Sequence, residues 1–244
     1  MNSEASSTAG QFTTTHWSVV LLAGREGLPE SAAALEKLCR AYWRPIWAFA
    51  RRKGAGEEDA KDLTQQFFAR LLERKGFSGL DRGKGKFRTF LLAAFTHFLA
   101  NEYDRANALK RGGGQPTFSL DEFPAEELGA SLAAEAVSPG TAFDWCWARE
   151  ILRTALAQLK REMSGEDKGR EFDELKQFLT IDAGADHYAV AAEKLGVAAS
   201  SVPVLAHRLR RRYREAVRRE VAQTVSSPTE LEEEMRYLFE LLNR

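Results

Sequence analysis

The chain is poor in the residues and motifs on which catalytic and metal sites depend. It has only two cysteines, Cys39 and Cys146, and neither has a His or Cys neighbour at metal-ligand spacing. The four histidines are scattered as well, and the sequence contains no phosphate-cradling glycine loop and no GxSxG or HExxH motif. We therefore predict a protein that is not an enzyme, with no metal site and no cofactor.

Long apolar runs and an excess of one charge are missing too. No stretch approaches the length that crosses a bilayer, and the N-terminus lacks the basic and apolar parts of a signal peptide. These absences predict a cytoplasmic protein without a membrane partner. Basic and acidic residues number 35 each, yet they are segregated, because residues 82–111 and 208–219 are basic while residues 121–135 and 230–234 are acidic.

The sequence does contain a succession of helical patterns. Apolar residues recur at helical spacing along most of the chain, and no alternating strand pattern stands out. Proline, glycine and acidic residues gather between two of these stretches, as in a linker. We predict an all-α fold of two small helical domains joined by an acidic linker, the second containing a helix-turn-helix. The predicted divisions are an N-terminal tail and short helix (1–30), a first domain (31–111), a linker (112–141), a second domain (142–225) and a C-terminal amphipathic helix (226–244).

The segment from Tyr188 to Arg219 is the most informative part of the chain. Two short helices are expected to meet at a turn, with the small Ala192 where they cross and Gly196 where the turn needs a positive φ. The second helix continues into seven arginines against the single acid Glu215. A helix in the DNA major groove needs such cations beside the phosphates, although an arginine-rich helix can also be only a solvated face. A net-neutral chain is expected to bind DNA weakly unless a larger partner helps.

Proline positions predict where two of the later helices begin. Pro203 would cost about 3 kcal/mol inside a helix, so the arginine-rich helix should begin late, with Ser200 or Ser201 as its cap. Residues 227–230 form a capping box with proline at the first helical position. The helix that they open carries an apolar stripe, and we hypothesise that it folds back on the second domain or receives a regulator.

Three segments, in order along the chain, are typical of a known family. They are residues 58–72, 85–92 and 188–213, with a linker of suitable length before the third. Together with residues 14–19 and the acidic C-terminal helix, they resemble long-tailed bacterial RNA polymerase sigma factors of the extracytoplasmic-function (ECF) type. The resemblance implies a sigma factor that binds core RNA polymerase and directs promoter-specific transcription initiation through −10 and −35 recognition of promoter DNA. It also allows an anti-sigma factor or another regulatory protein as a further partner.

The resemblance also implies a role for residues in each segment. The first segment would dock on core polymerase through Asp59, Asp62, Leu63, Gln65, Gln66, Phe68 and Arg70. The second would open the promoter and hold the single strand of the −10 element through Lys86, Arg88, His97, Asn101, Arg105 and Arg111. The third would read the −35 duplex through Ser200, Ser201, Val204, His207, Arg208, Arg211 and Arg212. His97 stands roughly where many relatives use Asn to hold a flipped base, so the chemistry of that pocket would differ here.

Two other classes of function remain open on the sequence. A stand-alone helix-turn-helix transcriptional regulator would bind its operator without polymerase, and its N-terminal half would only dimerise or sense a ligand. That reading leaves the polar residues between 59 and 66 unexplained. A helical adaptor would instead bind acidic proteins or membranes with its basic helix and would show no sequence preference on DNA.

Overall fold

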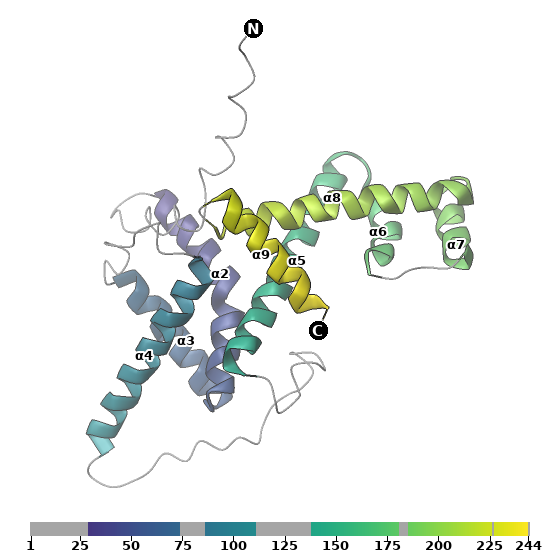
Figure 1. The fold of residues 1–244 in the computed structure, drawn as a ribbon. Helices are drawn as coiled ribbons and strands as arrows, with labels where there is room; N and C mark the ends of the chain where they lie inside the picture. Colours follow the sequence, from purple (N-terminus) through teal and green to yellow (C-terminus); the bar gives the residue numbers. More distant parts are fainter. Residues whose placement is uncertain (1–28, 74–85, 111–137, 181–184, 226, 244) are drawn as a thin grey trace. The chain divides into compact units, whose positions relative to one another are not determined.

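A computed structural model of the chain describes residues 29–73, 86–110, 138–180, 185–225 and 227–243. Within these ranges the regular structure is helical and no strand occurs, which confirms the predicted all-α class (Figure 1). The predicted short helix in residues 1–30, the linker up to residue 137 and Arg111 lie outside the described residues. In these same ranges, no single helix is both long enough and apolar enough to cross a membrane.

The chain divides into two compact units, whose bounds differ from those of the predicted domains. Unit 1 comprises Met1–Glu150 and Ala222–Arg244, and unit 2 comprises Ile151–Val221. The predicted linker (112–141) therefore falls between two segments of unit 1, and the C-terminal helix joins unit 1 as well. The reason is packing that the sequence pattern does not reveal, since the helix that begins at Pro139 and the last helix both contribute side chains to unit 1.

Unit 1 is built around an aromatic core supplied by three helices. These are α2 (Pro29–Arg52), which contains Pro45, α3 (Glu57–Glu73) and α4 (Phe87–Lys110). Phe95 of α4 lies edge-on to Phe67 of α3 and Phe49 of α2, with ring centroids 5.0 and 5.9 Å apart. Such edge-to-face pairs add to the burial of large apolar area, so α3 and α4 are held with fixed outer faces.

Two further helices complete unit 1. The start of α5 (Pro139–Gly165) packs on α2, where Trp47, Trp145 and Cys146 surround two buried alanines. The last helix, α9 (Pro228–Leu242), begins as predicted, because the Ser227 hydroxyl accepts a hydrogen bond of 3.2 Å from the Glu230 backbone N–H. Of the apolar stripe predicted for it, Leu231, Met235 and Leu238 are buried, Leu242 is half-buried and Phe239 is 47% exposed, while Leu241 is buried in addition. The hypothesis placed this helix on the predicted second domain (142–225), and Tyr237 of α9 does donate a hydrogen bond to Asp144 within that range, but both residues belong to unit 1.

Unit 2 consists of the rest of α5 followed by α6 (Gly169–Leu175), η2 (Lys176–Leu179), α7 (Ala185–Leu195), η3 (Ala199–Ser201) and α8 (Val202–Ala222). One apolar core joins these elements, with Phe172, Phe178 and Ala192 among its buried members. Two hydrogen bonds to main-chain oxygens fix α8, from Arg210 to Phe178 at 2.8 Å and from Tyr213 to Leu152 at 3.1 Å.

The connection between α7 and α8 follows the turn chemistry expected from the sequence. Gly196 ends α7 with φ of +66°, which confirms the predicted positive φ. The α8 helix starts late, at Val202, so Pro203 stands in its first turn, where its missing N–H costs nothing. A short 3₁₀ turn, η3, precedes it, and the α7 and η3–α8 segments meet at 105°.

Candidate functional site

The outer face of α3 is polar and open. Asp59, Asp62, Gln65 and Gln66 are exposed on it, one helical turn or less apart, while the buried apolar residues Phe67, Phe68 and Leu71 face the core. Three acidic residues, Glu57 among them, occupy the first turn, where negative charge favours the helix dipole. The face thus presents carboxylates and amides on a rigid support.

The other α3 residues that the sequence singled out are placed differently. Leu63 is half-buried at the edge of the open face. Phe68 is 4% exposed and stacks on Trp43 of α2, with 6.1 Å between ring centroids. Arg70 forms an ion pair of 2.5 Å with Glu102 of α4 and lies over the Phe98 ring. The Phe68 and Arg70 side chains therefore pack against other helices of unit 1, and the open face is formed by the exposed polar residues of α3.

The outer face of α4 brings together three of the residues assigned to the −10 element. His97, Asn101 and Arg105 are all exposed and lie four residues apart, so they follow one side of the helix. Arg105 has an exposed ion pair of 3.0 Å with Glu102, which solvent weakens. A stripe with a histidine, an amide and a cation can offer hydrogen bonds to base edges and charge to a phosphate backbone.

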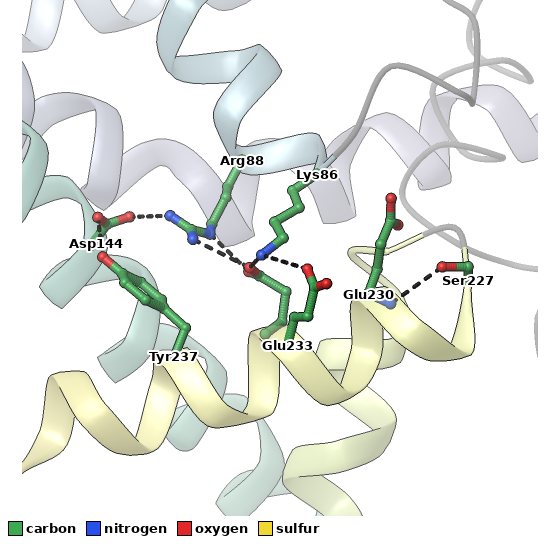
Figure 2. A network of polar contacts seen from close by, with 8 residues as sticks. Lys86, Arg88, Asp144, Ser227, Glu230, Glu233 and Tyr237 are labelled. Carbon is green, nitrogen blue, oxygen red and sulfur yellow. Dashed lines mark hydrogen bonds and ion pairs between the residues drawn. The ribbon is translucent and has the colours of Figure 1, made fainter.

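Lys86 and Arg88, the other two described residues of that set, do not lie free on the surface. Figure 2 shows both side chains reaching from the start of α4 toward α9. Lys86 lies 2.8 Å from a carboxylate oxygen of Glu234 and 3.4 Å from one of Glu233. Arg88 donates hydrogen bonds of 2.7 and 3.2 Å to the two oxygens of Glu234 and one of 2.5 Å to Asp144 of α5.

Aromatic rings enclose this cluster of charges. The Arg88 guanidinium lies 4.4 Å from the Tyr237 ring centroid and 5.2 Å from that of Trp147. The Tyr237 hydroxyl donates a hydrogen bond of 2.6 Å to Asp144. Burial lowers the pKa of Arg88, but the hydrogen bond to Glu234 and the charges of Asp144 and Glu234 outweigh it, so the pKa is raised above the ordinary value. Arg88 therefore stays a cation clamped between two carboxylates.

The start of α8 presents a continuous open surface. Ser200, Val204, His207, Arg208 and Arg211 are exposed, and their spacing of three or four residues puts them on one side of the helix. Val204 is 52% exposed and adds an apolar side chain to this polar surface. The Arg211 side chain is 76% exposed and has only a weak ion pair with Glu215 on the same helix.

Two residues assigned to the −35 surface lie away from it. Ser201 is half-buried beside the core. Arg212 donates hydrogen bonds of 2.9 and 2.8 Å to the two carboxylate oxygens of Glu166, in the turn that follows α5. This fork-to-fork pair lowers the pKa of Glu166 and raises that of Arg212. Arg212 therefore helps to hold unit 2 together, while its neighbour Arg211 faces outward.

The sequence reading missed the residues that surround Arg88. Asp144, Glu234 and Tyr237 come from helices 56 to 149 positions further along the chain, which no local pattern connects to α4. The only available signal was the complementary charge of residues 82–111 and 230–234. The charge pattern identifies two segments of opposite charge, but it does not show that they contact each other.

No group of three or more metal-ligating side chains suited to an ion is found in the described part of the chain. The thiols are hindered rather than activated, since burial raises the pKa of Cys39 and raises that of Cys146 to about 11. Comparisons with known proteins give no matching family model, no matching curated protein and no matching solved structure. The function therefore has to be argued from the surfaces themselves.

Proposed function

We propose that this protein is a sigma factor of the extracytoplasmic-function type, which binds core RNA polymerase and directs it to a class of promoters. The observation that carries the proposal is the open, arginine-bearing face at the start of α8, set at 105° to α7. Helix-turn-helix motifs join their two helices at about 90–120° and place the start of the second in the major groove.

The residues on this face have the chemistry of a −35 reader. Arg208 and Arg211 are exposed, and a guanidinium that donates two hydrogen bonds to guanine discriminates by about 1–3 kcal/mol. Exposed Val204 suits contact with a thymine methyl group, while Ser200 and His207 offer hydrogen bonds to bases or phosphates. Together they supply the positioning and base-reading contacts that a duplex reader needs.

The open face of α3 is our candidate for docking on core polymerase. Asp62 and Gln65 are exposed, and their side chains form no hydrogen bond or ion pair within the described ranges, so their hydrogen-bonding capacity is available. Half-buried Leu63 adds an apolar contact beside them, as in interfaces with a hydrophobic centre and a polar rim. The alternative of a stand-alone regulator gives this face no role.

The α4 stripe of His97, Asn101 and Arg105 is proposed to hold the unpaired strand of the −10 element. Two weak DNA surfaces on one chain gain affinity through effective concentration once polymerase aligns them. This division explains how a chain with zero net charge can direct specific initiation, and it fits a cytoplasmic protein. An anti-sigma factor or similar regulator is a further partner that the proposal allows.

The proposal is tested by run-off transcription with purified bacterial core polymerase, with and without the full-length protein, on fragments from upstream regions of its own genome. We expect new discrete starts that share two spaced upstream elements. No protein-dependent start, together with sequence-selective DNA binding by the protein alone, would replace the proposal with a stand-alone regulator. No sequence preference in either assay would favour a helical adaptor.

A further inference from the structure

The two cations at the start of α4 already have a polyanionic partner within the chain. We propose that α9 is an intramolecular cover, whose Glu233 and Glu234 occupy the phosphate-binding positions of Lys86 and Arg88 until single-stranded DNA competes for them. The inference rests on the proposed function in naming DNA as the competitor. It concerns regulation, because it makes strand capture by unit 1 conditional on the release of its last helix.

The donors of these cations are largely occupied in the closed state. Arg88 directs its Nε and one terminal nitrogen to Glu234 and the other terminal nitrogen to Asp144. Glu234 is 1% exposed, so a phosphate cannot reach the guanidinium while the carboxylate stays in place. A phosphate and a carboxylate both suit the planar fork of an arginine, and therefore they exclude each other here.

The composition of α9 suits such a competitor. Its 15 residues include five glutamates and the single basic residue Arg236. A helix with this charge presents an acidic face to a basic site, as a nucleic acid backbone does. Its ion pairs with Lys86 and Arg88 are made by Glu233 and Glu234, and its Tyr237 ring lies against the Arg88 guanidinium.

Opening of α9 does not require the aromatic core of unit 1 to unfold. The rings of that core come from α2, α3 and α4. Proteins open locally at lower free energy than they unfold as a whole. The buried stripe of Leu231, Met235 and Leu238 keeps the cover closed in the free protein.

The experiment measures binding of the full-length protein to a fluorescent single-stranded oligonucleotide by anisotropy over a range of salt concentrations. The variant is Glu233→Gln with Glu234→Gln, which keeps side-chain size and removes the competing charge. Glu240→Gln is the matched control, since Glu240 is an exposed glutamate of the same helix, whereas the ion pairs of α9 with Lys86 and Arg88 are made by Glu233 and Glu234. A third variant adds Lys86→Gln to the double substitution.

We expect the double variant to bind the strand roughly 3–10-fold more tightly, with a log–log salt slope steeper by about 0.7–1.4, the equivalent of one or two more phosphate contacts. Lys86→Gln should remove part of this gain, and the Glu240→Gln control should bind like wild type. An equal gain from Glu240→Gln would overturn the inference, because net charge alone would then explain it. So would an unchanged affinity in a folded double variant.

Glu233→Gln alone provides a milder variant if the double substitution does not fold, because the Glu233 side chain is 52% exposed and its ion pair in the described part of the chain is with Lys86. A smaller gain in affinity is then expected. Hydrogen exchange on the wild-type protein gives a second measurement. Saturating single strand should lower the protection of residues 228–242, and unchanged protection would overturn the cover.

Run-off transcription separates this inference from the proposed function. Polymerase-dependent starts together with unchanged strand binding in the glutamate variants would refute the cover and leave the sigma factor proposal intact. Failure of both transcription and strand binding in every variant would refute both. A gain in strand binding without any polymerase-dependent start would support the cover and refute the proposed function.

Discussion

At the scale of single residues, surroundings divide arginines that look alike in the sequence. Arg211 and Arg212 are neighbours in one basic run, yet the first is exposed and the second is paired with Glu166. Arg88 was likewise predicted to bind DNA, but its side chain is only 13% exposed and lies between the carboxylates of Glu234 and Asp144. Which arginine serves the fold and which is open to a ligand depends on partners that are distant in sequence.

Arg88→Met should destabilise the protein. The substitution keeps much of the side-chain volume but leaves buried Glu234 with Lys86 as its one remaining cation among the described residues, and it leaves Asp144 without its arginine. Breaking a buried pair from one side costs about 3 kcal/mol or more. Urea unfolding followed by circular dichroism measures the change. Arg105→Met is the control, because this exposed pair contributes less than about 1 kcal/mol; equal stability of the two variants would contradict the prediction.

The Glu166–Arg212 pair should give unit 2 a pH-dependent stability. Arg212 holds the pKa of Glu166 below its ordinary value of 4.5, so the contribution is complete above that pH and is lost as pH falls through the lowered native pKa. Glu166→Gln should therefore be less stable than wild type at pH 7, by a small margin, and equal to it near pH 3.

Urea midpoints at several pH values between 7 and 3 provide the measurement for this pair. Glu193→Gln serves as the control, since the Glu193 carboxylate is exposed on α7 and forms no ion pair with any other described residue. The difference in urea midpoint between Glu193→Gln and wild type should not change with pH. A Glu166→Gln difference that persisted at pH 3 would show that the effect is packing rather than charge.

At the scale of helices, local signals predicted where elements begin and long-range packing decided where they lie. Pro203 predicted the late start of α8, and Ser227 predicted the capped start of α9, because both effects act within one turn. Periodicity also predicted the buried stripe of α9. It could not say which helix the stripe would meet, since Arg88 and Glu234 are 146 positions apart.

Replacing a glycine by alanine should have opposite effects on stability at two helix ends, at Gly196 after α7 and at Gly165 in α5. Gly196 has a φ of +66° and open space around it, so Gly196→Ala should cost about 1 kcal/mol through backbone strain alone. Gly165, at the end of α5, also has open space but no positive φ, so Gly165→Ala should stabilise by about 0.5 kcal/mol. Thermal unfolding checks both, and destabilisation by the two alike would contradict the argument.

At the scale of the whole molecule, a net charge of zero is the sum of surfaces that differ in charge. The open face of α3 carries acids and amides, whereas the open face of α8 carries arginines, and each belongs to a different compact unit. A protein that acted only by binding DNA would need just the second surface. Under the proposed function each surface has its own partner, so damage to one should leave the binding of the other intact.

Charge substitutions on the two surfaces should therefore separate polymerase binding from promoter recognition. Asp62→Lys with Gln65→Lys reverses the α3 face and should weaken binding to core polymerase at least tenfold, or about 1.4 kcal/mol, without loss of stability. Arg208→Gln with Arg211→Gln should keep polymerase binding and lower run-off output from promoters with a −35 element. Glu240→Lys, an exposed change elsewhere in unit 1, is the control for charge reversal. Normal polymerase binding by the α3 variant would exclude this face as the docking surface, since a polar interface does not tolerate two new like charges at its centre.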